Sequence, residues 1–598
     1  MVWKILVVCI FVGIAIGVGL YSRRSAKSVD GFVLGGRNVG PWLSAFAYGT
    51  SYFSAVIFVG YAGQFGWRFG LSATWAGIGN AILGSLLAWW VLGPRAREMT
   101  HRLGATTMPE FFGKRYGSRA LRIAAAIIIF IFLIPYTASV YNGLSRLIVI
   151  AFGIDIPYEV CIVIMAVVTA IYVVLGGYMA TVVNDFIQGV VMLVGITAVI
   201  IAVLNGHGGF TAAIIQLSQV QAEGTALQGA YVSFFGPDII NLLGVVILTS
   251  LGTWGLPQMV QKFYAIKSGP AIKQGAIIST VFAFVVAGGS YFLGGFGRLA
   301  GMNPATAQFI EYSASGAIVY DSIMPALVSN IPDILLGILV VMVLSASMST
   351  LSSLVLTSSS TLTLDLIKGN VVKQMDERKQ VVWMRVLLVV FIVVSAGIGI
   401  IQVQGSLPFI AQLMGISWGA LAGAFLGPFL WGLYKKRVSK AAVWCSFIVG
   451  VCLTTGNMIS GNALGSPLNI GALELVLKYS TYPECQLVFI PEKQYHQLVW
   501  LEQYTDKNGE VGWMTFKAYI TGVLKKIPGG EYTKGEDNER EFTYGINSYK
   551  LTRKSDSGDE EVLVDYDPIN KVLILGGVDF GDKLKTARSM PRILMITN

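Results

Sequence analysis

Residues 331–362 read IPDILLGILVVMVLSASMSTLSSLVLTSSSTL, and this stretch decides the fold class. A helix of about 20 mostly apolar residues crosses the hydrocarbon core of a bilayer, and this stretch is longer than that. Its second half carries serines and threonines, and polar groups inside a membrane segment are costly enough to mark a site or a pathway. The stretch predicts a membrane-spanning helix with a polar site inside the membrane.

Similar apolar stretches recur along the 598-residue chain, which is 54% hydrophobic and only 13% charged. A soluble fold of this length could not bury so much apolar surface, so we expect an all-α membrane protein. We expect about 12 transmembrane helices, near residues 2–20, 39–63, 70–93, 121–150, 156–174, 184–204, 236–260, 274–299, 331–362, 384–403, 408–433 and 438–458. The first stretch has no small-residue cleavage site and no basic flank beyond Lys4, so we interpret it as a retained helix.

Lysine and arginine gather in alternate loops, at residues 23–37, 95–122, 262–273, 368–379 and 435–440. Basic loops face the cytoplasm, so we expect a multi-pass protein of the cell membrane with its N-terminus outside. The net charge of +10 is spread over these loops, which argues against nucleic acid as a partner and leaves the lipid bilayer. The five cysteines show neither a disulfide framework nor metal-ligand spacing.

The composition changes after about residue 475. Of the 123 residues in 476–598, 34 are charged, so we expect a soluble segment there. Sequence runs predict a helix at 513–526 and strands at 486–490, 497–504, 541–552, 561–566 and 572–575. We expect a small α+β domain without a nucleotide loop or a catalytic constellation. It is either an extracytoplasmic domain, because twelve spans that start outside also end outside, or a fused segment that did not evolve with the membrane part.

Three places inside the membrane part carry polar residues. In residues 47–54, glycine and hydroxyl residues interrupt a span, and unwinding there would free carbonyl oxygens for a hard cation such as Na⁺. In residues 346–353, three serines at positions i, i+3 and i+4 line one helix face. Asp185 is an isolated carboxylate at the start of an apolar span. Each place also has a purely structural interpretation, as a packing face of small residues or as a helix cap.

Four motifs resemble, in order, those of the sodium:solute symporter family, whose members carry proline, pantothenate, sialic acids and sugars. The motifs are GGR at 35–37, the segment from GG to DFIQ at 176–188, PQMVQKFYAIKS at 257–268 and MSTLS at 348–352. The resemblance covers roughly residues 1–470.

This resemblance implies a LeuT-type core of two inverted five-helix repeats within residues 39–433, one at 39–204 and one at 236–433, each beginning with a broken helix. Residues 1–38 would be an added transmembrane helix with a cytoplasmic loop, and residues 434–475 a further helix with the remnant of another. The second break is expected at residues 252–257, where a proline and two glycines favour unwinding.

The resemblance also implies the ligands of the coupling ions. The main sodium site would use the carbonyl oxygens of Thr50, Phe53 and Ala346 and the hydroxyls of Ser349 and Thr350. A second site, present in some members, would use Asp185, Ser349, Ser352 and Ser353. All four residue types of the second set are retained, so we expect two sodium ions.

The solute is expected beside these ions, against the broken helices. Its expected lining is Ser54, Thr253, Trp254, Gln258 and Gln412. Trp254 has an alternative interpretation as a packing or interfacial aromatic residue. Tyr52 stands where the proline-transporting branch of the family has an acidic residue, and Thr253 where an aromatic gate residue is common. These two residues favour neither proline nor galactose as the solute.

We therefore predict a secondary active transporter, not an enzyme, that carries a small organic solute together with Na⁺ by alternating access. Na⁺ is the coupling ion, and we expect no organic cofactor. One alternative is a solute sensor whose C-terminal domain signals, which predicts a cytoplasmic signalling module that the tail does not show. A passive channel is the other alternative, and the broken-helix motifs disfavour it.

Overall fold

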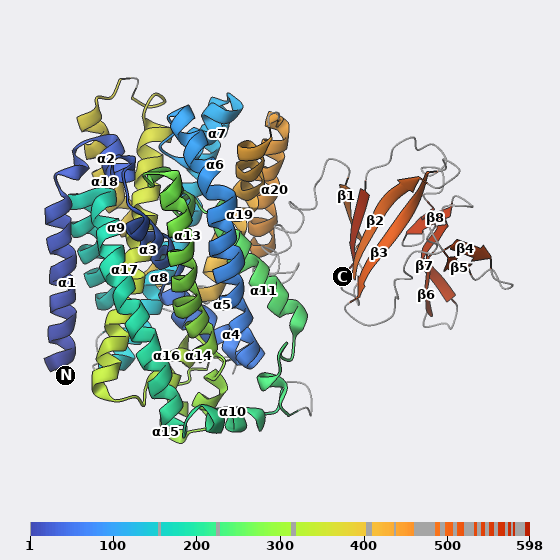
Figure 1. Ribbon diagram of the computed structural model, residues 1–598, viewed down its shortest axis with the longest axis horizontal. Coiled ribbons are helices and arrows are strands. Elements are labelled where there is room, and N and C mark those ends of the chain that lie inside the picture. Colours follow the sequence, from blue (N-terminus) through green and yellow to red (C-terminus); the bar gives the residue numbers. More distant parts are fainter. Residues whose placement is uncertain are drawn as a thin grey trace. The chain divides into compact units, whose positions relative to one another are not determined.

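The computed structural model describes residues 2–459, apart from 153–156, 223–227, 313–317, 373, 402–409 and 436–437, and beyond them the strands between residues 485 and 597. The chain divides into two compact units, Met1–Leu475 and Val476–Asn598. The first unit is a bundle of helices and the second is built of strands (Figure 1).

The bundle has long helices that run between its two ends and short ones at turns and breaks (Figure 1). The helices of its first half are α1 (Val2–Ser22), α2 (Val29–Leu34), α3 (Pro41–Tyr52), α4 (Ala62–Phe69), α5 (Thr74–Gly79), α6 (Ala88–Leu103), α7 (Met108–Tyr116), α8 (Arg119–Phe152), α9 (Tyr158–Gly206) and α10 (Phe210–Ser218). Those of its second half are α11 (Ile239–Leu251), α12 (Pro257–Ala265), α13 (Gly269–Ala283), α14 (Gly289–Gly294), α15 (Pro304–Ala307), α16 (Ile323–Val328), α17 (Asp333–Thr361), α18 (Glu377–Ile401), α19 (Ile410–Tyr434) and α20 (Lys440–Ile459).

Two helices break where the sequence predicts a break. α3 ends at Tyr52, Phe53 is extended (φ −99°, ψ 126°), and the helix resumes in the π-helical turn η3 (Val56–Tyr61). α11 continues through the 3-10 turn η7 (Gly252–Gly255) and meets α12 at an angle of 51°. Leu256 is extended between them, because Pro257 disfavours helical backbone in the residue before it and has no N–H to continue the helix.

α9 is interrupted at Gly177. This glycine has φ 55° and ψ −146°, a backbone conformation that side-chain-bearing residues rarely adopt, and a Cβ there would lie 2.9 Å from the carbonyl oxygen of Phe32. As a straight helix the 49 residues of α9 would be about 74 Å long, more than twice the ~30 Å hydrocarbon core. The interruption falls between the two spans that the sequence predicts at 156–174 and 184–204.

In the described part, eight helical segments are long and apolar enough to cross a membrane, or nine if the bent pair of α11 and α12 is one span. Two of the eight, Val56–Leu103 and Tyr158–Gly206, have 48 and 49 residues and are too long for a single crossing. Starting from nine, the expected count of about 12 is reached only if each of these two segments is divided into two spans and the shorter apolar helix Leu6–Ser22 is added. The count therefore stays a prediction.

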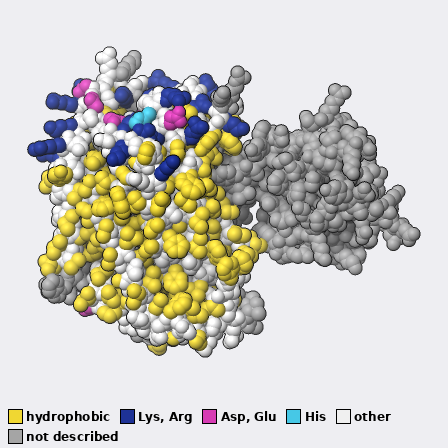
Figure 2. Space-filling model, viewed as in Figure 1, with side chains coloured by type: hydrophobic (Ala, Val, Ile, Leu, Met, Phe, Trp, Pro, Cys, Tyr) yellow, Lys and Arg dark blue, Asp and Glu magenta, His cyan; other side chains and the backbone are white. Residues whose placement is uncertain are grey.

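The surface of the bundle is apolar around its middle and basic at one end (Figure 2). Large aliphatic side chains are exposed, among them Ile277 (66%), Val393 (65%) and Val194 (62%), as expected where lipid rather than water covers a helix. Lysine and arginine side chains gather at one end, which we call the basic end, and α1 begins at the opposite end (Figures 1 and 2).

Hydrogen bonds join the predicted basic loops to one another at the basic end. Arg37 donates to the carbonyl of Ala105, Arg97 to those of Ile266 and Lys267, Arg115 to that of Lys435, and Arg119 to that of Gly369. The basic loops therefore lie on the same side of the bundle, as the alternation of charge along the sequence requires.

In the second unit the structure describes strands and their pairing. They are β1 (Cys485–Ile490), β2 (Gln497–Thr505), β3 (Val511–Tyr519), β4 (Glu531–Lys534), β5 (Arg540–Thr543), β6 (Tyr549–Lys554), β7 (Glu560–Asp567), β8 (Val572–Leu575), β9 (Val578–Asp579) and β10 (Arg592–Thr597). They form sheets with strand orders β1-β10-β2-β3, β4-β5 and β6-β7-β8-β9. β1 and β10 are parallel, and the other neighbours are antiparallel.

The prediction of a helix at 513–526 is wrong for residues 513–519, because these residues lie in strand β3. β3 pairs with β2 as an antiparallel hairpin, with Thr505 opposite Val511. The sequence held this signal, because Asn508-Gly509 between two runs rich in aromatic residues is typical of a hairpin. Residues 520–526 lie outside the described residues. The strand runs expected elsewhere agree with the structure, except that 541–552 divides between β5 and β6.

Candidate ion and solute site

The break of α3 lies against the serine-rich half of α17. Thr350 Oγ1 donates to the carbonyl of Phe53 at 3.3 Å, and the hydroxyls of Ser51 and Ser353 are 2.9 Å apart. All four residues are buried. The structure thus brings together two of the three polar places that the sequence singles out, residues 47–54 and residues 346–353.

The break leaves backbone oxygens beside these hydroxyls. The last helical hydrogen bond of α3 runs from the amide of Phe53 to the carbonyl of Gly49 at 3.2 Å, so the carbonyl of Thr50 is not used by a further turn. The carbonyl of Phe53 points to α17, since it accepts the hydroxyl of Thr350. Neutral oxygens gathered at a helix break are suitable ligands for Na⁺.

Ser349 differs from the other serines of α17. Its Oγ has no hydrogen-bond partner in the described part of the chain, although the residue is completely buried. Ser347 Oγ donates to the carbonyl of Val343 at 2.8 Å, and Ser352 Oγ to that of Ser349 at 2.8 Å. Ala346 lies one turn before Ser349 and is also buried. A buried hydroxyl without a partner needs an explanation, and a bound cation supplies one.

Asp185, the third polar place, reaches the same spot from α9. It is completely buried and faces the Ser349 hydroxyl, and neither of its carboxylate oxygens accepts a short, well-aligned hydrogen bond from a described residue. Its position in the interior of α9 rules out the alternative role of a helix cap. Asp185 therefore lies against the serine face of α17, beside Ser349.

Lys262 also reaches this spot, and its assignment to a basic loop is wrong. Every residue of α12 is buried, and Lys262 is only 1% exposed. Its Nζ donates to Ser353 Oγ at 3.0 Å, lies 4.0 Å from Asp185 Oδ2 and stands 5.2 Å from the ring centre of Tyr178. The sequence held one signal: Lys262 follows Pro257 closely, so it belongs to the broken span and not to the loop beyond it.

Among the predicted solute residues, Gln258 alone has both polar atoms unpaired within the described part, and it is 1% exposed. Ser54 accepts the amide of Val56 at 3.2 Å and so caps the second half of the broken helix. Thr253 donates to the carbonyl of Ser250 at 2.8 Å, and Trp254 Nε1 to that of Leu83 at 3.1 Å. Gln412 lies on α19, but its side chain is outside the described residues.

An aromatic cluster beside these residues is not predicted from the sequence. The ring of Trp418, on α19, meets those of Tyr136, Tyr52 and Tyr61 edge-on, with centroids 6.0, 6.4 and 6.5 Å away. The members of this cluster come from segments far apart in the sequence, so no local sequence pattern indicates the cluster. The Tyr52 hydroxyl donates to the carbonyl of Thr249, which joins the break of α3 to the end of α11.

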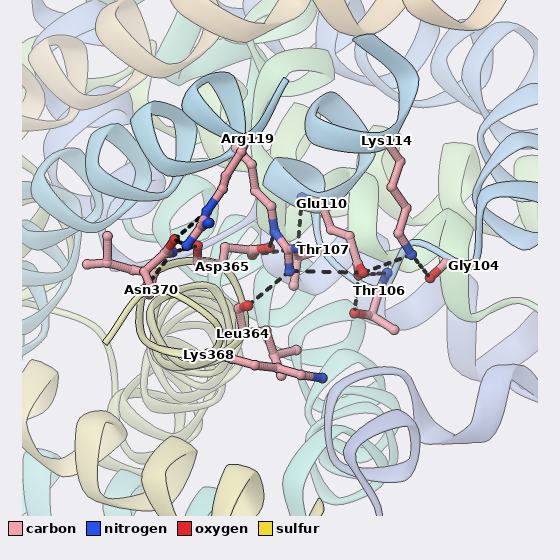
Figure 3. A network of polar contacts seen from close by, with 12 residues as sticks. Gly104, Thr106, Thr107, Glu110, Lys114, Arg119, Leu364, Asp365, Lys368 and Asn370 are labelled. Carbon is pink, nitrogen blue, oxygen red and sulfur yellow. Dashed lines mark hydrogen bonds and ion pairs between the residues drawn. The ribbon is translucent and has the colours of Figure 1, made fainter. Parts of the chain in front are cut away.

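At the basic end a polar network ties the two halves of the bundle together (Figure 3). Asp365, in the π-helical turn η11 (Leu362–Ile367) that follows α17, is buried. It accepts Thr107 Oγ1 at 2.6 Å and Arg122 Nε at 2.6 Å, and Arg122 also donates to the carbonyl of Leu364 at 2.9 Å. The network therefore holds α7 and α8 against the end of α17.

Glu110, on α7, continues the same network (Figure 3). It accepts the amide and the hydroxyl of Thr106, both at 2.8 Å, and pairs with Lys114 at 2.9 Å. Burial by itself would raise the pKa of Glu110, but the hydrogen bonds from Thr106 and Lys114 outweigh it and hold the pKa below its ordinary value.

Known proteins resemble most of this chain. The osmoregulated proline transporter OpuE of Bacillus subtilis is 27% identical over 451 residues, which cover 73% of this chain and 86% of OpuE. A sodium/proline symporter of Salmonella typhimurium is 28% identical over 451 residues, 74% of this chain and 85% of its own. The structure of a Na⁺-coupled sialic acid symporter in a substrate-bound outward-open state shares the fold, with a TM-score of 0.61 and 17% identity over 79% of this chain and 96% of its own.

The end of the chain resembles a different protein. A family model of phage tail tube protein FII matches residues 455–587. This match gives no support to the sensor alternative.

A family model described as the sodium:solute symporter family matches residues 32–450. The relatives are transporters, so the protein is a Na⁺-coupled secondary active symporter and not an enzyme, with Na⁺ as its coupling ion. Because residues 32–450 make up most of the chain, the protein belongs to the sodium:solute symporter family.

Proposed function

We propose that this symporter binds its coupling Na⁺ where the break of α3 meets the serine face of α17. The proposed ligands are the carbonyl oxygens of Thr50, Phe53 and Ala346 and the hydroxyls of Ser349 and Thr350. The 3.3 Å hydrogen bond from Thr350 Oγ1 to the carbonyl of Phe53 carries the proposal, because it brings a hydroxyl of one helix against the freed carbonyls of the other. When Na⁺ enters, Thr350 turns its hydrogen away and both oxygens face the ion.

Asp185, Ser349, Ser352 and Ser353 form a second cation site in this proposal, which shares Ser349 with the first. The buried carboxylate of Asp185 supports it, because a buried charge is stable only beside an opposite charge. Ser353 already has two partners, the hydroxyl of Ser51 and the ammonium of Lys262. The occupant of this second site therefore has to be compatible with a positive charge on Lys262.

The solute is a small organic molecule that binds beside the first Na⁺, against both breaks. Gln258 supplies its main hydrogen bonds, since its buried amide has no partner among the described residues. Ser54, Thr253 and Trp254 use their polar atoms within the protein and act as walls. Gln412 stays a predicted member of the lining. Proline is the first solute to test, because two relatives are named for it, although Tyr52 lacks the charge of the acidic residue that the proline branch has there.

The transport cycle in this proposal uses about 12 crossings, with two inverted repeats at 39–204 and 236–433, an extracytoplasmic N-terminus and a cytoplasmic basic end. The basic loops joined at one end support this orientation. Opening towards the cytoplasm has to separate α7 and α8 from the end of α17, so it breaks the contacts of Asp365 with Thr107 and Arg122.

Residues 476–598 take no part in transport in this proposal and are a fused segment that resembles a phage tail tube protein. Their separate unit and their match to that family model support the idea. The proposed topology puts them outside the cell. Protease added to intact cells should therefore cut a site introduced near residue 540, and protection of that site would contradict the topology.

Uptake of radiolabelled solutes into proteoliposomes tests the transport proposal. The panel contains proline, other amino acids, carboxylates, a sialic acid and galactose, each with and without an inward Na⁺ gradient. We expect saturable uptake of one class, which stops when the gradient is collapsed. A solute affinity that does not change with Na⁺ would contradict the symport mechanism, because coupling requires each ligand to raise the affinity for the other.

A further inference from the structure

Lys262 brings a positive charge of the chain itself to the second cation site. Its ammonium donates to Ser353 Oγ at 3.0 Å and lies 4.0 Å from Asp185 Oδ2, so it is hydrogen-bonded to one of the four residues of that set and close to a second. Lys262 and Asp185 are 1% and 0% exposed, which keeps water from screening either charge.

The fold holds this ammonium in place. The 51° bend before α12 turns that helix against α3 and α17, where all its residues are buried. The neighbouring Gln261 fixes the helix, because its Nε2 donates to the carbonyl of Val33 at 2.9 Å and its Oε1 accepts the hydroxyl of Thr357 at 2.9 Å. Lys262 therefore belongs to a helix that is hydrogen-bonded to its neighbours, and its side chain is not a flexible one on the surface.

The carboxylate of Asp185 is balanced by this ammonium in the described part of the chain. A 4.0 Å separation is longer than a hydrogen bond, so the two groups attract each other without a tight pairing. A sodium ion bound to Asp185 would stand within a few ångströms of Nζ in a dry environment. The two positive charges would repel each other strongly, and one carboxylate cannot balance both.

We propose that the Lys262 ammonium is the resident cation of the second site and takes the place of a second sodium ion. The protein then binds one Na⁺, at the first site, and residue 262 sets the ion stoichiometry. This inference rests on the proposed Na⁺ sites. One bound Na⁺ is therefore expected in place of the two that the retained ligand types suggest.

Equilibrium binding of ²²Na⁺ to the purified full-length protein in nanodiscs tests the inference. The wild type should bind one Na⁺ per protein. Lys262→Gln should bind two, with a Hill coefficient that rises from 1 towards 2, and the double variant Lys262→Gln/Asp185→Asn should return to one. Two ions on the wild type, or one on Lys262→Gln, would overturn the inference. A wild type that binds no Na⁺ would contradict the proposed function instead.

Lys267→Gln is the matched control, because Lys267 is an exposed lysine five positions further along the chain and should leave the count at one. Thermal unfolding of each variant shows whether it is folded. If Lys262→Gln does not fold, the reversal potential of the wild type in proteoliposomes decides the question. One Na⁺ per solute supports the inference, and two contradict it.

Discussion

Removing the Ser349 hydroxyl should weaken Na⁺ binding without destabilising the sodium-free protein. Ser349 Oγ makes no well-aligned hydrogen bond to a described residue, although it faces the Asp185 carboxylate, so Ser349→Ala removes a weakly held buried hydroxyl. The melting temperature without Na⁺ should therefore change little. A contact between a hydroxyl and a charged group contributes about 1.5–3 kcal/mol, so Na⁺ affinity should fall by about 10- to 150-fold.

The assay is the Na⁺ concentration that half-saturates solute uptake, together with the rise in melting temperature that Na⁺ produces. Ser347→Ala is the control, because Ser347 is also buried on α17 but its Oγ donates to the carbonyl of Val343 at 2.8 Å. It should cost about 1 kcal/mol of stability and leave Na⁺ affinity unchanged. A Na⁺ affinity of Ser349→Ala within about twofold of wild type would contradict a direct contact between this hydroxyl and Na⁺, since one hydroxyl ligand accounts for about a tenfold change or more.

Three further outcomes follow from the structure. Gln258→Leu should raise the KM for the solute about tenfold or more with little change in Na⁺ binding, because it removes the unpaired buried amide. The lowered pKa of Glu110 means that its stabilising contribution is complete above its ordinary pKa and is lost as the pH falls through the lowered value. As the pH is lowered from 7 to below the ordinary pKa of a glutamate, the melting temperature should therefore drop less in Glu110→Gln than in wild type. Deletion of residues 476–598 should leave Na⁺-driven uptake unchanged, and loss of uptake in a folded truncation would give the tail a role.

The helix breaks can be predicted from the sequence, because proline and glycine have known effects on a helical backbone. Pro257 has no N–H to continue the helix and the glycines before it weaken helical backbone, and the structure bends there by 51°. The hydroxyls of Ser349, Ser352 and Ser353 were equally visible, since their spacing on a helix puts them on one face. What the sequence does not contain is the contact between the two elements, because the meeting of α3 with α17 depends on how the whole bundle packs.

Lys262 and β3 show how local patterns fail. A lysine soon after an apolar span looks like a loop residue, because the charge rule counts residues without knowing whether they are buried. Burial of Lys262 results from the bend before α12 and from partners on α9 and α17. Residues 513–519 can form a helix or a strand, and pairing with β2 decides in favour of the strand.

In the proposed second site, the number of bound sodium ions depends on charge balance and not only on ligand type. The oxygens of Asp185, Ser349, Ser352 and Ser353 suffice to predict a second ion if ligands alone are counted. The structure adds Lys262 to the same place, and the single carboxylate there can balance one cation, either Na⁺ or the ammonium. A relative that keeps these four residues but has a neutral residue at the position of Lys262 should therefore bind one more Na⁺ than this protein. Equal ion counts in two such proteins would show that the ammonium and Na⁺ do not compete.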